Sequence, residues 1–167
     1  MRKRLVPDAF LRSVYDITPA YLAERGLEGL ILDIDNTLTT YSCREAEEHT
    51  LRWIRELRAA GVRLCILSNG GEERVRAYNR ALGLPFRFRS MKPRRAGFSW
   101  AASELGLPPE RIAVVGDQLF TDVAGGNGAG MYTILTEPFA ADEMWLVRCK
   151  RLLERPLLRR MREGRGR

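Results

Sequence analysis

The chain has 167 residues, of which 45% are hydrophobic and 29% charged, and its formal net charge is +7. This length suits one compact domain with a full core, and the composition is typical of a globular protein and argues against a disordered chain. No stretch approaches the roughly 18 apolar residues that cross a bilayer, and no apolar signal core opens the chain, so we expect a cytoplasmic protein.

The predicted elements begin with a short helix near the N-terminus. Thr18, Pro19 and Gly26 have the positions of an N-cap, a first-turn proline and a C-terminal stop. We therefore predict that residues 1–27 form a helical segment packed on the domain.

Strands and helices then alternate along the chain. Apolar runs predict strands at residues 29–32, 62–67, 86–88, 112–115 and 132–135. Apolar side chains at helical spacing predict helices through residues 50–57, 75–82 and 98–105. We expect residues 28–140 to form a single doubly wound, Rossmann-like α/β domain with a mainly parallel sheet of about five strands flanked by helices.

The spacing of polar residues leaves no room for a cap domain over this sheet. The interval from Asp33 to Ser68 holds a flap and one helix, and the interval from Ser68 to Lys92 holds one helix and a short strand. In doubly wound sheets ligands bind beyond the carboxyl ends of the strands. We therefore expect an open site at that edge.

Two features invite a functional interpretation that their context does not favour. The glycine-rich stretch 125–130 lacks the G-x-G-x-x-G spacing of a dinucleotide loop and precedes a strand, so we predict that it ends a helix and turns the chain. His49, the only histidine, falls on a predicted helix away from the strand ends, so we expect a surface residue.

The positive charge is concentrated at the C-terminus. Residues 148–167 contain nine Lys/Arg and two Asp/Glu, a net charge of +7 that equals the charge of the whole chain. Apolar residues from Trp145 to Leu153 can share one helix face with arginines opposite, so we predict a basic amphipathic tail over residues 141–167 that contacts anionic membrane. The alternative is a solvated tail whose apolar residues dock on the domain.

Polar side chains gather where the predicted strands end. Asp33 and Asp35 follow the first strand of the core, Ser68 and Asn69 the second, and Asp117 and Asp122 the fourth, while Lys92 lies in the loop after the third. Carboxylates that converge on one crevice repel each other unless a cation neutralises them. Mg²⁺ is the expected cation because it prefers oxygen ligands.

These residue types suit phosphoryl transfer. A carboxylate at a rigid strand end, such as Asp33, can attack phosphorus and form an aspartyl-phosphate. Asp35, two residues further on, can protonate the leaving alcohol and later activate water. Ser68 and Lys92 can bind phosphoryl oxygens as charge shifts during transfer.

The same residues carry a resemblance to a known family. DIDNTLT at 33–39, LSN at 67–69, Lys92-Pro93 and GDQLFTD at 116–122 resemble the four motifs of haloacid dehalogenase (HAD) superfamily phosphatases. An aspartate at the second acidic position of the first motif implies a phosphohydrolase. Outside the motifs the chain is similar, over nearly its whole length, to the YqeG group of subfamily IIIA, whose relatives include phosphatidylglycerophosphate phosphatases.

The resemblance implies a role for each motif residue. Asp33 is the nucleophile and a metal ligand, Asp35 the acid/base and a metal ligand through its backbone carbonyl, Asp117 a metal ligand, Ser68 and Asn69 substrate binders, Lys92 the charge stabiliser, and Asp122 and Thr37 supporting residues. The implied cofactor is Mg²⁺.

An open site suits a large substrate that covers it, or an oligomer that supplies a neighbouring surface. We therefore expect a phosphatase of a lipid headgroup, with phosphatidylglycerophosphate as the first candidate, on the inner face of the membrane. The alternatives are a phosphatase of soluble metabolite, protein or nucleic-acid phosphomonoesters, and a non-catalytic RNA- or ribosome-binding module. The oligomeric state is left open.

Overall fold

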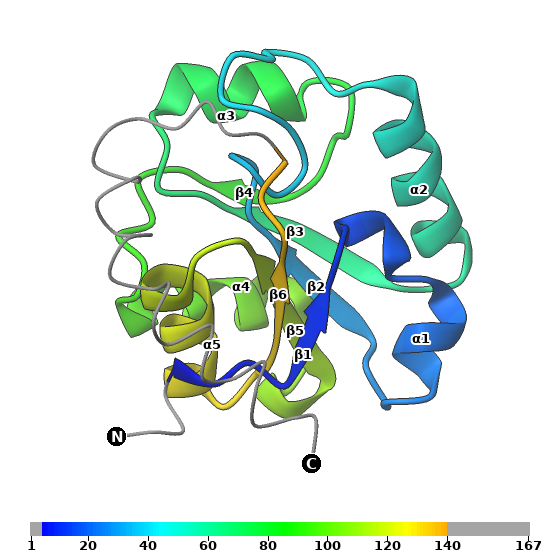
Figure 1. Ribbon diagram of the computed structural model, residues 1–167, viewed down its shortest axis with the longest axis vertical. Coiled ribbons are helices and arrows are strands. Elements are labelled where there is room, and N and C mark those ends of the chain that lie inside the picture. Colours follow the sequence, from blue (N-terminus) through cyan, green and yellow to red (C-terminus); the bar gives the residue numbers. More distant parts are fainter. Residues whose placement is uncertain (1–4, 140–167) are drawn as a thin grey trace.

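A six-stranded parallel sheet with helices on both faces makes up the protein in a computed structural model, which describes residues 5–139 (Figure 1). The strands are β1 (Ala9–Leu11), β2 (Gly29–Leu32), β3 (Arg63–Leu67), β4 (Phe86–Arg87), β5 (Ile112–Gly116) and β6 (Tyr132–Thr136). The α-helices are α1 (Pro19–Ala23), α2 (Glu48–Ala59), α3 (Glu72–Asn79), α4 (Arg95–Leu105) and α5 (Ala124–Ala129), and shorter helical segments are η2 (Val14–Asp16), η3 (Pro109–Arg111) and η4 (Leu119–Val123). The tail predicted at 141–167 lies outside the described residues.

The strand order β1-β6-β5-β2-β3-β4 confirms the doubly wound architecture. All five predicted strands are present, and β1 is a sixth, parallel to β6 with Ala9 opposite Ile134. Residues 5–27 therefore supply an edge strand as well as the expected helix α1. Sequence patterns did not indicate β1 because it has three residues, each only half-buried, and so lacks a continuous apolar run.

Side chains alternate between the two faces of the sheet, as the period of a strand requires. On β2, Leu30 and Leu32 pack in a cluster with residues of α1, α2 and α3, whereas Ile31 packs in a second cluster with residues of α4. Figure 1 shows α1 and α2 on one side of the sheet and α4 and α5 on the other. Burial on both faces explains why these strands are continuously apolar.

All the predicted helices are present, although α3 ends at Asn79 and leaves Leu82 in the turn that follows it. Thr18 caps α1 by accepting a hydrogen bond from the Tyr21 amide at 3.1 Å, and Pro19 occupies the first turn. On α2 the buried residues are the predicted ones: Thr50, Trp53, Ile54 and Leu57. His49 lies half-exposed on α2, where Nδ1 is 3.2 Å from a Glu47 carboxylate oxygen.

The glycine-rich stretch differs from its prediction. Residues 124–129 form helix α5, and only Gly130, with φ of 78°, ends it. A Cβ on Gly125 would lie 2.2 Å from Phe98, and one on Gly126 would lie 2.6 Å from Thr133. These glycines therefore let α5 approach α4 and β6 closely, a tertiary requirement that outweighs their poor helix propensity.

The topology places the polar residues at one point of the sheet. From β2 the chain proceeds to β3 and β4 on one side, then returns to β5 and β6 on the other, so the switch point lies between the adjacent strands β2 and β5. In the described part of the chain, the intervals between Asp33, Ser68 and Lys92 contain only loops, α2, α3, β3 and β4, and hence no cap domain. None of the helices in residues 5–139 is long and apolar enough to span a bilayer.

Candidate active site

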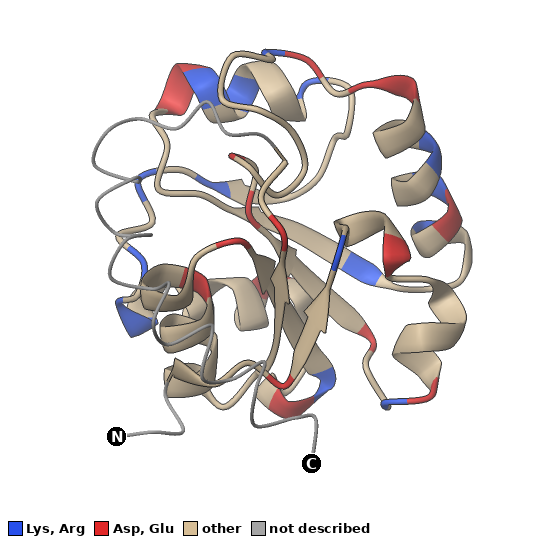
Figure 2. Cartoon of the chain, in the orientation of Figure 1, with Lys and Arg blue, Asp and Glu red and all other residues tan. Residues whose placement is uncertain are grey.

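Three aspartates meet where β2 and β5 end. Asp33 directly follows β2, Asp117 directly follows β5, and Asp122 lies in η4. All three are buried, and one carboxylate oxygen from each lies within 4.8 Å of the others. Figure 2 shows the acidic positions after β2 and β5 at this edge of the sheet. The structure thus brings together side chains that are up to 89 positions apart in the sequence, the interval from Asp33 to Asp122.

Lys92 connects two of these carboxylates. Its Nζ donates to Oδ1 of Asp33 and to Oδ1 of Asp122, each at 2.7 Å, and its side chain is 3% exposed. Burial by itself would lower the pKa of Lys92, but the two carboxylates outweigh burial and raise it. Burial raises the pKa of Asp33 to about 7, against the opposing effect of Lys92. A second cation bound beside Lys92 would favour the ionised form of Asp33.

The loop that carries Lys92 is held by Asn69. The Lys92 amide and the Ser90 hydroxyl both donate to Oδ1 of Asn69, at 2.8 and 3.0 Å, and Nδ2 of Asn69 donates to the Lys92 carbonyl at 3.2 Å. Asn69 thus positions the loop of Lys92 through one N–H and the oxygen of its exposed amide. Its role in binding substrate stays a prediction.

Hydroxyls and backbone amides orient the other two acids. Oδ2 of Asp122 accepts from the Thr121 hydroxyl at 3.1 Å and from the Gln118 amide at 3.3 Å. The Thr37 hydroxyl donates to Oδ1 of Asp117 at 3.4 Å. Each carboxylate therefore has a fixed orientation within the fold.

Asp35 lies outside the aspartate cluster and pairs with Arg74, a residue that sequence reasoning missed. Nε and Nη2 of Arg74 lie 3.2 and 3.0 Å from Oδ1 of Asp35, and Nη2 also donates to the Thr40 carbonyl at 3.2 Å. Burial raises the pKa of Asp35 and Arg74 opposes this rise. Within residues 5–139, the buried Nη1 of Arg74 has no hydrogen-bond partner.

A sequence signal for Arg74 did exist. Basic residues are unfavourable in the first turn of a helix, because the helix dipole is positive there. Arg74 nevertheless occupies the first turn of α3, directly after the loop that follows Ser68 and Asn69. A cation in that position indicates a role outside the stability of the helix, which for Arg74 is its pairing with Asp35.

Ser68 completes the group of predicted residues at this edge. It follows β3, is 1% exposed, and its Oγ accepts from the Gly70 amide at 3.0 Å. A Cβ on Gly70 would lie 3.2 Å from Oγ of Ser68 and 3.4 Å from Oδ2 of Asp35, so both oxygens flank the same small residue. Ser68 and Asp35 are thus neighbours in space.

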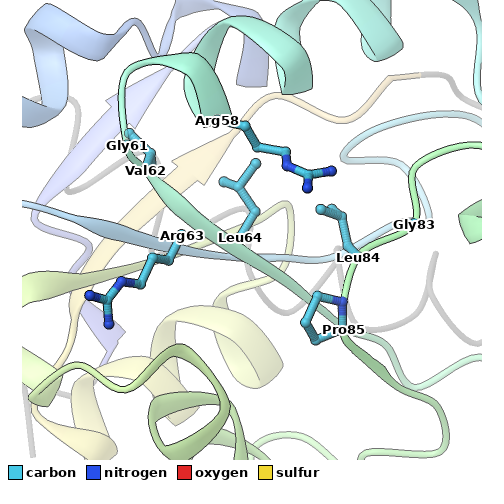
Figure 3. A pocket seen from close by; sticks show the side chains of 8 residues that line it. All are labelled: Arg58, Gly61, Val62, Arg63, Leu64, Gly83, Leu84 and Pro85. Carbon is cyan, nitrogen blue, oxygen red and sulfur yellow. The ribbon is translucent and has the colours of Figure 1, made fainter.

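A separate pocket of about 280 Å³ lies at the opposite end of β3 (Figure 3). Arg58, Arg63 and Pro85 are among the residues that line it. Arg63 donates to the carbonyls of Leu105 and Gly106, and Figure 3 shows its side chain directed away from the other labelled arginine. None of the aspartates lines this pocket, so it is separate from the candidate active site.

The aspartate cluster fits a hard divalent cation. Its donors are carboxylate oxygens from Asp33, Asp117 and Asp122, and Mg²⁺ binds such oxygens while it retains several waters. The ligands implied by the resemblance are Asp33, Asp117 and the backbone carbonyl of Asp35, with Asp122 in a supporting role. The burial of three acids against one lysine supports the fit, because a cation relieves their repulsion.

Mg²⁺ is expected to stabilise the folded protein at this site. At about ten times the dissociation constant, binding adds about 1.4 kcal/mol to the free energy of unfolding, which corresponds to a rise of about 3–5 °C in Tm. Thermal unfolding with and without Mg²⁺ measures this rise in Tm. Asp117→Asn should reduce the rise, whereas Asp16→Asn, a surface cap of η2, should keep it. Equal rises in both variants would place Mg²⁺ elsewhere.

The sequence of the chain is similar to those of known phosphatases. The HAD-hydrolase-like family matches residues 90–138. The chain is 37% identical to the probable phosphatase YqeG of Bacillus subtilis over 158 residues, which cover 95% of this chain and 92% of that protein. It is 30% identical to the chloroplastic/mitochondrial phosphatidylglycerophosphate phosphatase 1 of Arabidopsis thaliana, over 98% of this chain and 50% of that longer protein.

Solved structures share the fold. The cobalt-bound deoxy-D-mannose-octulosonate 8-phosphate phosphatase of Haemophilus influenzae aligns with a TM-score of 0.56 and 18% identity, over 75% of each chain. A HAD phosphatase of Thermococcus onnurineus aligns with a TM-score of 0.55 and 17% identity, over 65% of this chain and 86% of that one. Taken with the similarity to YqeG over almost the whole sequence, the aspartate and lysine geometry leads to one conclusion: this chain belongs to the HAD superfamily of phosphatases, in the YqeG group.

Proposed function

We propose that this phosphatase is Mg²⁺-dependent, forms an aspartyl-phosphate on Asp33, and removes the phosphate of phosphatidylglycerophosphate at the membrane surface. The observation that carries the chemistry is the position of Lys92 Nζ, 2.7 Å from both Asp33 and Asp122, inside a cluster of buried aspartates. A buried nucleophile beside a fixed cation is what phosphoryl transfer requires.

In the first half-reaction, a carboxylate oxygen of Asp33 attacks phosphorus and the ester oxygen leaves. Asp35 gives its proton to that oxygen, so the product is a neutral alcohol. Lys92 and the Ser68 hydroxyl stabilise the phosphoryl oxygens as charge moves onto them. Bound Mg²⁺ would keep the cluster ionised and withdraw charge from a phosphoryl oxygen.

In the second half-reaction, Asp35 is a carboxylate and accepts a proton from an incoming water. The water oxygen bonds to phosphorus, the bond to Asp33 breaks, and inorganic phosphate leaves. Asp35 ends the cycle protonated and Asp33 ends it ionised. Arg74 holds Oδ1 of Asp35 throughout, so Oδ2, the oxygen beside Gly70, is the one that exchanges the proton.

Two observations support a lipid substrate. The relatives from Arabidopsis thaliana and Chlamydomonas reinhardtii are named phosphatidylglycerophosphate phosphatases, with 30% and 32% identity. The described core also has no cap to enclose a small metabolite, so a headgroup held at a membrane can cover the site instead. The basic tail at 141–167 would add attraction to the cytoplasmic leaflet.

A substrate panel tests this proposal. Purified full-length chain in Mg²⁺ is assayed against phosphatidylglycerophosphate in mixed micelles, beside glycerol phosphate, a nucleoside monophosphate and a phosphopeptide. We expect kcat/KM for the lipid to exceed that for each soluble ester by at least about tenfold. The lipid substrate binds the protein through additional contacts, and additional binding energy raises kcat/KM. Preference for a soluble ester would overturn the lipid assignment, and RNA retention without hydrolysis of any ester would overturn the phosphatase mechanism.

The substitution Arg74→Met should slow hydrolysis most for substrates with poor leaving groups. Without Arg74 the carboxyl of Asp35 loses its orientation, and alkyl esters need its proton whereas aryl esters scarcely do. We expect kcat/KM to fall about 10²-fold for an alkyl phosphate and much less for an aryl phosphate. Because Arg74 lowers the pKa of Asp35, its loss raises that pKa, so the alkaline limb of the alkyl profile should move to higher pH.

The matched control for that variant is Arg76→Met on the same helix. Arg76 is exposed and pairs with Glu72, away from Asp35. The Arg76→Met variant should hydrolyse both the alkyl and the aryl phosphate at nearly the wild-type rate. Equal losses for alkyl and aryl esters in Arg74→Met would show that Arg74 does not act through proton transfer to the leaving group.

Gly116→Ala should displace Asp122. A Cβ on Gly116 would lie 2.2 Å from Cγ of Asp122, so the carboxyl has to move away from Lys92. Since a shift of about 1 Å near the chemistry costs about 10²-fold, we expect that loss in kcat. Gly29→Ala, which meets Leu107 at 2.7 Å far from the acids, should lower Tm but keep kcat. A Gly116→Ala enzyme with normal kcat would show that Asp122 is dispensable.

A further inference from the structure

We infer that the loop from Phe88 to Arg95, which carries Lys92 into the site, is also the surface by which this phosphatase docks on an anionic lipid bilayer. This inference rests on the proposed function for its substrate, but it concerns a surface made by residues that take no part in the chemistry. It is independent of the predicted C-terminal tail.

The loop separates inward from outward side chains. Ser90 and Lys92 are buried, whereas Arg89 and Met91 are exposed, Met91 by 54%. Arg89 and Met91 have φ angles of 43° and 57°, in the left-handed region that bulky residues seldom adopt. Hydrogen bonds that the loop donates to Asn69 and to the Ser68 and Gly70 carbonyls maintain this conformation, so the outward presentation is built into the fold.

The exposed positive charges of the loop have no acidic partners. Arg89, Arg94 and Arg95 are exposed, and within residues 5–139 none of them belongs to an ion pair. Arg94 and Arg95 are the N-cap and first residue of α4, where positive charge opposes the helix dipole. They therefore do not serve helix stability. Figure 2 shows basic positions following one another along the segment between β4 and α4.

Exposed apolar side chains border the same site. Of the described residues, four large apolar side chains are exposed, and three of these lie in segments that adjoin residues of the site or their neighbours: Tyr41, Met91 and Phe139. Met91 precedes Lys92, the amide of Phe139 donates to the carbonyl of Asn36 beside Asp35, and Tyr41 follows Thr40, which accepts from Arg74. Apolar tips among unpaired arginines are what an anionic membrane interface binds.

An RNA surface would use the same arginines, but two features favour a bilayer. Met91 is aliphatic and offers no stacking face to a base, whereas insertion among lipid chains uses its exposed apolar surface. The exposed residues also lie in segments that adjoin a site with no cap, so docking would bring a headgroup phosphate to Asp33 and close the site to water.

Vesicle co-sedimentation of the full-length chain tests the surface. The probes are phosphatidylcholine vesicles with and without phosphatidylglycerol. The variants are the triple Arg89→Gln/Arg94→Gln/Arg95→Gln and the single Met91→Ser. A matched triple removes the same charge elsewhere: Arg52→Gln and Arg58→Gln on α2, and Arg80→Gln after α3, all exposed and without ion pairs in the described part of the chain.

We expect the loop triple to weaken binding to phosphatidylglycerol vesicles by about 10- to 100-fold at low salt, and the control triple by only a few-fold. Met91→Ser should weaken it several-fold, with little dependence on salt. Equal losses in the two triples would overturn the inference, because charge alone and not this surface would then set the affinity. If the loop triple lost RNA binding in a parallel retention assay while its vesicle binding stayed intact, the inference would be overturned in favour of nucleic acid.

The same variants separate failure of the docking surface from failure of the proposed function. The loop triple should hydrolyse a soluble aryl phosphate within about twofold of wild type, because its residues lie outside the machinery. Normal vesicle binding without hydrolysis of phosphatidylglycerophosphate would refute the substrate and leave the surface standing. Hydrolysis of that lipid in vesicles at wild-type rates by the loop triple would refute the surface and leave the substrate standing.

Discussion

An Asp33→Asn enzyme is expected to lose hydrolysis of every phosphomonoester by at least about 10³-fold, because an amide cannot attack phosphorus. The substitution keeps the shape of the side chain, and Lys92 still has Asp122 as a partner at 2.7 Å. The loss should therefore appear in kcat, with the free energy of unfolding little changed. Steady-state kinetics and denaturant unfolding measure the two quantities.

Trapping the intermediate makes this prediction specific to Asp33. Wild-type protein quenched in acid during turnover of a radiolabelled phosphate ester should carry a label that hydroxylamine removes, as an acyl phosphate does, and Asp33→Asn should carry none. Asp8→Asn is the matched control, since Asp8 binds Thr133 away from the cluster and should label normally. Full hydrolysis by Asp33→Asn would require a different nucleophile.

Replacing Lys92 with methionine should damage both stability and turnover. Lys92 is buried and holds two carboxylates, so its loss leaves Asp33 and Asp122 facing each other without a fixed cation. Breaking such a buried pair costs about 3–5 kcal/mol of unfolding free energy. Turnover should fall by about 10²–10³-fold, more in kcat than through KM, because Lys92 acts on charge that develops during transfer.

The stability deficit of Lys92→Met should depend on pH in a defined direction. The pKa of Asp33 is already raised to about 7 by burial, and without Lys92 it rises further. When the pKa of a carboxyl is higher in the folded than in the unfolded state, the folded protein is most stable while that carboxyl is protonated. The free energy of unfolding then falls as pH rises through the folded pKa. The deficit should therefore be small near about pH 5 and large near about pH 8, as denaturant unfolding at the two pH values would show.

Two comparisons complete this test. Mg²⁺ should restore more stability to Lys92→Met than to wild type, since it would supply the missing positive charge. Arg94→Met, two residues further along and exposed, should change the free energy of unfolding by less than about 0.5 kcal/mol. A Lys92→Met deficit independent of both pH and Mg²⁺ would mean that packing, rather than charge, is what the lysine contributes.

Local patterns in the sequence suffice to predict the layered fold and the edge at which the site forms. Apolar runs and helical spacing are local patterns, so β2 and the buried face of α2 from Thr50 to Leu57 could be predicted without tertiary information. The chain order of strands also implied that Asp33, Ser68 and Asp117 share one edge, because parallel strands end together. Recognition of the four motifs then supplied their implied roles.

The contacts between particular side chains of the site could not be predicted and are seen first in the folded chain. The pairing of Asp35 with Arg74 joins residues 39 positions apart, and the hold of Asn69 on Lys92 spans 23. Such contacts depend on how loops meet across the sheet, which no local pattern records. For the same reason α5 forms through glycines that pack against Phe98, and β1 forms because β6 offers it an open edge.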